Sequence, residues 1–158
     1  MSHVRPQSPV GNARVAHPNL GTPYRFSPTD DDLARVMKRV SEYVWHEMPD
    51  DGGWDYGTNL PYLKDLCDYW VREFNRWDHQ AKLDQFNHFQ NRVDGIDTHY
   101  LFEKGSGPNP TPLLIAHGWP GSICEFLDIV EPLAHPERFG GSVEQAFDVI
   151  APSLPGFG

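Results

Sequence analysis

Residues 112–122, which read P-L-L-I-A-H-G-W-P-G-S, constrain the fold more than any other part of the chain. Residues 113–116 are all apolar, which is typical of a strand in a parallel sheet that is covered on both faces. The glycines and proline that follow turn the chain at the carboxyl end of this strand, where open α/β sheets place their ligands. We therefore expect a buried strand that ends in a functional loop.

A helix is expected directly after this loop. Ser122 and Glu125 form an S-x-x-E pattern, the signature of a capping box, in which each side chain accepts a hydrogen bond from the backbone near the other residue. Apolar positions follow at helical spacing: Phe126, Leu127, Val130 and Leu133. The first N–H groups of such a helix face the loop, an arrangement that suits an anion or a developing negative charge.

Length and charge limit the classes of protein that are possible. A chain of 158 residues can form one domain with a sizeable core. A formal net charge of -9 argues against nucleic acid or an anionic membrane as the main partner, because both would repel an acidic surface. No apolar run is long enough to span a bilayer and no signal peptide is recognised, so we expect a soluble, cytoplasmic protein. His79, His88 and His99 lack metal-ligand spacing, and no metal or cofactor is expected.

Three regions follow along the chain. Residues 1–22 contain several prolines and glycines without periodicity and are expected to form a mobile tail. Residues 23–90 form a helical region, and residues 91–158 begin an α/β core that is incomplete. In the helical region, the pattern S-P-T-D from Ser27 predicts a helix start with Pro28 at the first helical position, and a second helix is predicted from Thr58 or Asn59.

The hydrophobic period changes from helical to alternating after residue 86. Two strands are predicted on either side of Asp94-Gly95, because this dipeptide accepts the positive φ angles of a tight hairpin turn. Residues 147–151 form a further strand after the capped helix. A strand, helix and strand in this order imply parallel strands with a right-handed connection. The fold class is therefore α/β, with a helical arm before the first strands of the sheet.

Several residues could carry chemistry, and most have a structural explanation. His117 could be a general base, but no nucleophile is adjacent, and a histidine before a glycine turn is more typical of hydrogen bonding that fixes the loop. Ser122 lacks the G-x-S-x-G pattern of a nucleophile elbow, and the capping box accounts for it. The Trp and Tyr residues at 45–77 are most simply an aromatic core, with cover of an active site as the alternative. Cys67 and Cys124 fall on apolar helical positions and are expected to be free thiols.

Trp119 differs because its backbone, not its side chain, is the group that the loop exposes. An N–H group at the end of a buried strand, next to Gly118 and before Pro120, can point into a dry cleft and stabilise an oxyanion. In α/β-hydrolases the loop after this strand donates one such N–H, and the residue after the nucleophile donates the other. The sequence supplies only the first donor, with His117, Gly118, Pro120 and Gly121 as the residues that shape the loop.

Taken together, these motifs resemble those of microsomal-type epoxide hydrolases and their relatives, including juvenile hormone epoxide hydrolases. The resemblance runs from about residue 23 to residue 158. The motifs that carry it are H-G-W-P-G-S at 117–122, P-S-L-P-G-F-G at 152–158, W-D-Y-G at 54–57, L-D-Q-F at 83–86 and V-D-G-I at 93–96. The segment N-R-W-D at 75–78 departs from the family, which usually has an acid followed by Trp-Arg.

The resemblance implies the activity of the complete enzyme. Such enzymes open a small hydrophobic epoxide by attack of an elbow aspartate, while cap-domain tyrosines donate to the ring oxygen. A histidine with an acid partner then activates water against the covalent ester, and a vicinal diol leaves. Trp119 matches the family position that supplies one oxyanion-hole N–H, and the bond between Trp119 and Pro120 is expected to be cis.

Three hypotheses follow from the sequence. The first is the N-terminal portion of an epoxide hydrolase, inactive alone because no elbow nucleophile, cap tyrosines or His-acid pair is recognised in these residues. The second is a stand-alone interaction or pseudoenzyme domain. The third keeps the fold but changes the chemistry to a serine esterase or dehalogenase, which the residue in the elbow would decide. In the family's strand order the Leu113 strand lies next to the nucleophile strand, so its open edge is expected to favour self-association.

Overall fold

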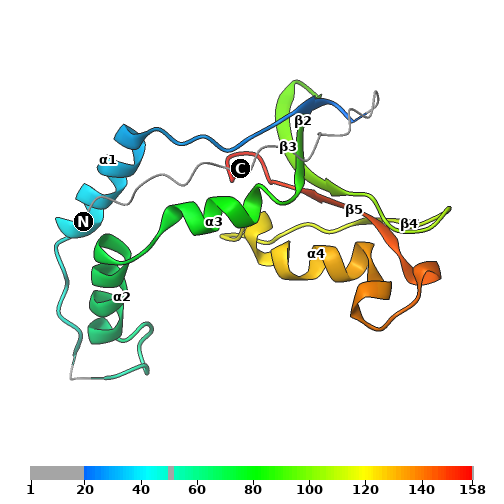
Figure 1. The fold of residues 1–158 in the computed structure, drawn as a ribbon. Helices are drawn as coiled ribbons and strands as arrows, with labels where there is room; N and C mark the ends of the chain where they lie inside the picture. Colours follow the sequence, from blue (N-terminus) through cyan, green and yellow to red (C-terminus); the bar gives the residue numbers. More distant parts are fainter. Residues whose placement is uncertain (1–19, 50–51, 158) are drawn as a thin grey trace. The chain divides into compact units, whose positions relative to one another are not determined.

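The computed structural model describes residues 20–49 and 52–157 (Figure 1), so the tail predicted for residues 1–22 lies almost entirely outside the described residues. The chain divides into two compact units. The helical unit comprises residues 27–76, and the sheet unit comprises residues 20–26 and 77–157. Each is described by itself.

The helical unit begins with α1 (Asp30–Ser41), whose N-cap is Thr29. The predicted start two residues earlier is therefore wrong. Thr29 has an extended backbone, and its hydroxyl accepts a hydrogen bond from Asp32 N at 3.1 Å while the Asp32 carboxylate accepts from Thr29 N at 3.1 Å. This reciprocal capping box satisfies the N–H groups of Thr29 and Asp32, so it decides the start of the helix.

The second helix, α2 (Leu60–Arg72), confirms the predicted start, since the Asn59 side chain accepts from Tyr62 N at 3.0 Å. α1 contacts α2, yet neither helix contains a buried residue. Trp54 and Tyr62 contact each other in a tilted arrangement, with 5.3 Å between ring centroids, but are 61% and 51% exposed. The expected aromatic core is therefore wrong for this part of the chain, because the described part of the helical unit is too thin to enclose its aromatic rings.

The sheet unit has α3 (Arg76–Leu83) before a sheet of five strands, of which β4 and β5 are parallel and the other pairs antiparallel. The strands in chain order are β1 (Thr22–Pro23), β2 (Asn87–Val93), β3 (Ile96–Glu103), β4 (Thr111–Leu114) and β5 (Phe147–Pro152). Their order in the sheet is β1-β2-β3-β5-β4. The parallel pair confirms the predicted crossover.

The predicted hairpin between β2 and β3 is present. Asp94 and Gly95 have φ angles of 49° and 84°, which is the left-handed geometry that a two-residue turn needs. The turn pairs Val93 with Ile96 and thereby fixes the register of the whole hairpin, in which Gln90 faces His99 and His88 faces Leu101. His88 and His99 consequently lie on one face of the sheet as diagonal neighbours.

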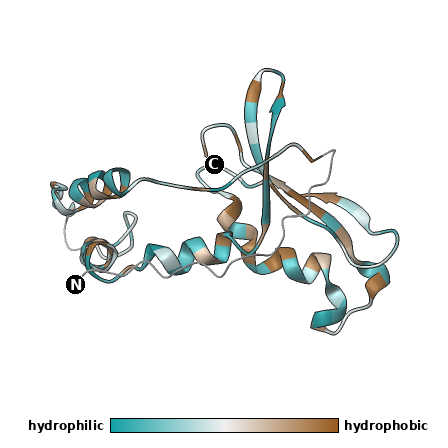
Figure 2. Cartoon of the chain, turned by 45° about the horizontal axis from the view of Figure 1, so that its top comes forward, coloured by the Kyte–Doolittle hydropathy of each residue, from teal (hydrophilic) through white to brown (hydrophobic). Residues whose placement is uncertain are grey.

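The core lies between this face and the helix that follows the loop. A 3₁₀ turn (Ile123–Phe126) continues into α4 (Leu127–Ala134), which lies along the sheet (Figure 1) and contains apolar residues (Figure 2), of which Val130 and Ala134 are buried. Leu101, Val130 and Val149 are fully buried. The other buried members of this core are Ile123, Ala134 and Ala151.

β4 is an edge strand in the described part of the chain, as the sequence predicted. The predicted cover on both faces is wrong for these residues, because Leu114 is 66% exposed. One edge of the strand pairs with β5, where Leu113 faces Val149. Its other backbone edge has no neighbouring strand among residues 20–49 and 52–157, which is a template for further pairing.

Candidate functional site

His117 follows the carboxyl end of β4 and joins two loops. The ring is buried and accepts a hydrogen bond at Nε2 from Leu154 N at 3.1 Å, in the loop that follows β5. Because Nε2 accepts, the neutral ring carries its hydrogen on Nδ1, which lies 3.0 Å from Gly118 O and donates to it. Both ring nitrogens thus have a hydrogen-bond partner, and the ring links the loop after β4 to the loop after β5.

Trp119 lies at the turn of the first loop. The peptide bond between Trp119 and Pro120 is cis, as expected, and Gly121 N donates to Gly118 O at 2.7 Å to close the turn. The indole is 80% exposed. Within the described residues no backbone or side-chain acceptor takes the Trp119 N–H, so this donor is available to a ligand.

The predicted capping box after the loop is confirmed. Ser122 Oγ accepts from Cys124 N at 3.3 Å, and the Glu125 carboxylate accepts from Ser122 N at 3.2 Å. The Ser122 hydroxyl is therefore engaged in the cap and is no nucleophile. The cap anchors the end of the loop onto the start of the helix that packs against the core.

Gly121 is required because the capping carboxylate occupies the space beside it. A β-carbon at this position would collide with Glu125 Oε1 and lie 2.9 Å from Gly118 O, whereas one at Gly118 would meet nothing within 4 Å. We expect Gly121→Ala to displace the cap and lower the free energy of unfolding of the sheet unit by about 1 to 2 kcal/mol.

Urea denaturation of the chain measures this difference, and Gly118→Ala is the matched control because it adds the same methyl group to open space. Equal losses for the two variants would contradict the role assigned to Gly121.

The second loop, residues 153–157, is held by two buried histidines that the sequence did not single out as a pair. Ser153 Oγ lies 2.8 Å from His99 Nδ1, and His99 Nε2 lies 3.0 Å from His88 Nδ1. His88 Nε2 in turn lies 2.8 Å from Leu83 O. Burial, and then the neighbouring His88, lower the pKa of His99 to about 4, so the ring is neutral at pH 7.

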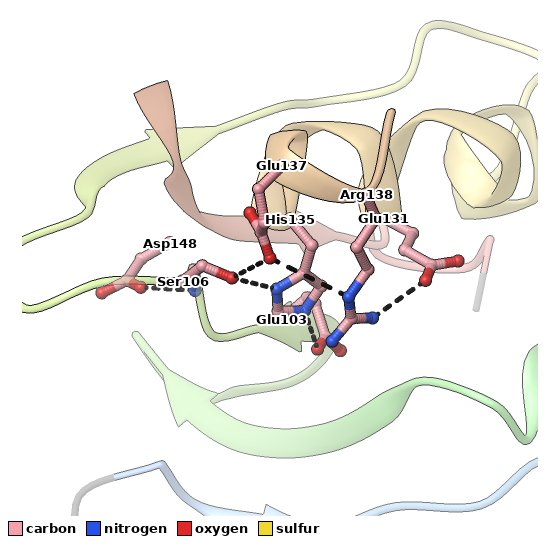
Figure 3. Close-up of polar contacts among 8 residues, drawn as sticks. Glu103, Ser106, Glu131, His135, Glu137, Arg138 and Asp148 are labelled. Carbon is pink, nitrogen blue, oxygen red and sulfur yellow. Dashed lines mark hydrogen bonds and ion pairs between the residues drawn. The ribbon is translucent and has the colours of Figure 1, made fainter. Parts of the chain in front are cut away.

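A further polar cluster surrounds His135, between α4 and the 3₁₀ turn at Pro136–Phe139 (Figure 3). Its Nδ1 lies 2.7 Å from Ser106 Oγ, and its Nε2 lies 3.2 Å from Glu103 Oε1. Ser106 donates to Glu137 Oε1 at 2.9 Å. The pKa of Glu137 is lowered, first by a hydrogen bond from its own backbone and then by Ser106, His135 and Arg138.

This cluster does not belong to the candidate site. Ser106 lies in the loop that precedes β4, whereas His117 follows the same strand, so the two groups lie at opposite ends of β4. Ser106 N also donates to Ala134 O at 2.9 Å, which ties the loop to the end of α4. The Ser106 hydroxyl donates to a carboxylate, so the cluster is a structural tie and not a Ser-His-acid nucleophile.

No helix in residues 20–49 and 52–157 is both long and apolar enough to cross a membrane.

Two loops thus follow the carboxyl ends of the parallel strands β4 and β5, and the first carries a backbone N–H that no acceptor takes among the described residues, an arrangement that is typical of the α/β-hydrolase fold. Residues 21–126 match the family described as "Epoxide hydrolase N terminus", and the chain belongs to this family.

Curated relatives agree. A putative epoxide hydrolase of Stigmatella aurantiaca is 35% identical over 137 residues, a match that covers 87% of this chain and 31% of the relative. Epoxide hydrolase 1 of Oryctolagus cuniculus is 35% identical over 141 residues, with 86% and 31% covered. The chain thus spans about a third of the length of these relatives.

Solved structures share the fold. The epoxide hydrolase of Aspergillus niger matches with a TM-score of 0.73 at 24% identity, over 87% of this chain and 36% of that structure. The juvenile hormone epoxide hydrolase of the silkworm Bombyx mori matches with a TM-score of 0.71 at 26% identity, over 85% of this chain and 32% of that structure. The sheet unit is therefore the first part of an α/β-hydrolase fold, as the sequence predicted.

Proposed function

We propose that this chain is the part of an epoxide hydrolase that supplies one oxyanion-hole donor, the Trp119 N–H, to the conversion of a small hydrophobic epoxide and water into a vicinal diol. The observation that supports the proposal is a backbone donor without an acceptor among the described residues, in a loop fixed by the buried His117. His117, Gly118, Pro120 and Gly121 are then loop-shaping residues.

The chemistry places the donor in the second half of the reaction. A carboxylate opens the ring and forms an alkyl ester while the ring oxygen takes a proton. Water then attacks the ester carbonyl, its proton passes to a base, and the carbonyl oxygen becomes an oxyanion. When this intermediate collapses, the ester bond to the alkyl oxygen breaks, and the departing oxygen takes the proton to give the diol. An N–H positioned at that oxygen stabilises the charge only as it develops, which lowers the barrier rather than tightening substrate binding.

The test separates the backbone donor from the indole. The chain is fused to the C-terminal part of the Stigmatella aurantiaca relative that follows the matched segment, and styrene oxide hydrolysis is measured. Replacing the amide at residue 119 by an ester, with the indole kept, is expected to lower kcat about 10²- to 10³-fold with little change in KM. The matched control is Trp119→Phe, which keeps the N–H and is expected to retain most of the activity.

Two outcomes would count against the proposal. A fusion that is fully active with the ester at residue 119 would exclude the donor role. Turnover of styrene oxide by the 158-residue chain alone would contradict the expectation that the nucleophile and base lie outside these residues. The only G-x-D-x-G pattern in the sequence, at residues 53–57, lies in a turn before α2 rather than between a strand and a helix, and no G-x-S-x-G pattern occurs, so we expect the chain alone to form no diol.

The open edge of β4 supports a second expectation, that copies of the chain associate. Exposed Leu114 and the unpaired backbone of this strand favour pairing with another strand. We expect sedimentation velocity to detect dimers or larger species as the concentration of the chain rises. Leu114→Lys should reduce this association, because charge at an edge strand opposes pairing, whereas Ile129→Lys on the exposed surface of α4 should not.

A cytoplasmic location remains a prediction of the sequence, which fractionation of cells expressing the chain would test.

A further inference from the structure

The buried side chains of His88, His99 and Ser153 form a hydrogen-bonded series. The donor and acceptor in each hydrogen bond follow from Leu83 O, at which the series begins. Leu83 O can only accept, so His88 Nε2 carries a hydrogen and donates to it at 2.8 Å. A neutral His88 then accepts at Nδ1 from His99 Nε2 at 3.0 Å. His99 accepts at Nδ1 from the Ser153 hydroxyl at 2.8 Å. With both rings neutral, each therefore has one tautomer, and every polar atom of the series is satisfied.

The series reaches the oxyanion loop through the backbone. Ser153 is held twice by His99, through the side chains and through Ser153 N, which donates to His99 O at 2.9 Å. The next residue, Leu154, donates its N–H to His117 Nε2 at 3.1 Å, and His117 donates to Gly118 O. Gly118 directly precedes Trp119. A continuous set of hydrogen bonds and peptide bonds thus runs from Leu83, at the end of α3, to Gly118, the residue before the Trp119 N–H.

Burial makes this set rigid. The side chains of His88, His99, His117 and Ser153 are buried, so water does not compete for their hydrogen bonds. The rings that contact His99 are His88 on β2, at 5.2 Å between centroids, and Tyr24 and Phe26 after β1, at 4.9 and 4.8 Å. The titratable groups facing His99 are therefore His88 and Tyr24. No carboxylate contacts the ring among the described residues, so nothing there compensates a charge on it.

We propose that His88, His99 and Ser153 are positioning residues that hold the β5 loop against His117 and thereby set the direction of the Trp119 N–H. The effect of this positioning on catalysis rests on the proposed function, whereas the positioning itself does not. A protonated His99 would donate at both ring nitrogens, and the Ser153 hydroxyl would have to turn its hydrogen away. The loop would then lose the single arrangement that the neutral series imposes.

The experiment uses ¹⁵N-labelled chain and the variants Ser153→Ala and Ser153→Thr. Ser153→Ala removes the hydroxyl, and we expect the Leu154 amide to exchange about tenfold faster with solvent, the size of effect that loss of one buried hydrogen bond produces. The ring nitrogens of His117 should shift from the pure Nδ1–H tautomer toward a mixture. Ser153→Thr keeps the hydroxyl and is expected to restore both readouts.

Amides in the β2–β3 hairpin distinguish positioning from a general loss of stability. If their exchange rises by the same factor as that of Leu154, Ser153 acts on the whole fold and the proposal is wrong. An unchanged Leu154 amide and an unchanged His117 tautomer in Ser153→Ala would also overturn it. An effect confined to residues 117–121 and 154 supports it.

Activity tests the catalytic part separately. In the fusion that carries the C-terminal part of the Stigmatella aurantiaca relative, Ser153→Ala is expected to lower kcat several-fold and leave KM nearly unchanged, with recovery in Ser153→Thr. A loosened Leu154 amide together with a fusion that never hydrolyses epoxides would contradict the proposed function and support the positioning role. Normal kcat in the Ser153→Ala fusion, together with faster exchange of the Leu154 amide, would contradict the link between loop positioning and catalysis.

Discussion

Replacing Leu101 with alanine is expected to lower the free energy of unfolding of the sheet unit by about 3 to 4 kcal/mol. Leu101 is fully buried on β3, between β2 and β5, and packs in the core with Val130 and Val149. The substitution loses the burial of the removed carbons and leaves a cavity that the flanking strands cannot close, because both are fixed in register by backbone hydrogen bonds.

Leu114→Ala is the matched control, because it removes the same atoms from a side chain that is 66% exposed. Its cost is expected to stay below about 1 kcal/mol. Urea denaturation followed by NMR signals of β3 and β5 measures both variants on the sheet unit. Comparable losses would mean that Leu114 is buried in solution, for example by association through the β4 edge.

Lowering the pH from 6.5 to 4 is expected to remove up to about 3 kcal/mol of stability from the sheet unit through His99 alone. The pKa of His99 is about 4 in the folded chain, against 6.5 for a histidine without these surroundings, the value that applies to the unfolded chain. The unfolded state therefore binds the proton first, and stability rises with pH between these two values. The stabilisation is complete above pH 6.5 and lost as the pH falls through the folded pKa.

The slope of the unfolding free energy against pH, measured between pH 6.5 and 5, tests whether His99 is the titrating group. His99→Asn cannot be protonated there, and its amide oxygen can still accept from Ser153, so we expect a flatter pH profile of the unfolding free energy. His46→Asn changes an exposed histidine of the helical unit and should keep the original slope. An identical slope in His99→Asn and the unchanged chain would refute the assignment. The carboxyl groups of Glu137 and Glu144 have lowered pKa values and contribute only at more acidic pH.

Features decided by neighbouring residues could be predicted from the sequence. The Asp94-Gly95 turn and the Ser122 capping box depend on side chains within three positions of each other, and both are present. The start of α1 was misplaced because Ser27 and Thr29 both suit an N-cap, and only the reciprocal bond with Asp32 selects Thr29. Local chemistry was the same for both candidates, so the sequence pattern could not separate them.

The buried series of His88, His99 and Ser153 could be predicted only in part from the sequence. The hairpin register alone implies that His88 and His99 are diagonal neighbours, so that pair could have been found from the two-residue turn. Their link to Ser153 depends on the pairing of β3 with β5, in which Leu101 faces Ala151, and no local pattern predicts that register. The tie between Ser106 and His135 likewise joins residues 29 positions apart.

The bridge from Leu154 to His117 has a consequence for exchanging segments between relatives. Because one loop donates to the other through a buried ring, each loop conformation is defined only in the presence of its counterpart. A chimera that imports residues 117–121 from another epoxide hydrolase without residues 153–157 would combine a donor and an acceptor that were not selected together. Variant libraries aimed at new substrate preferences should therefore exchange residues 117–121 and 153–157 together, both from the same relative.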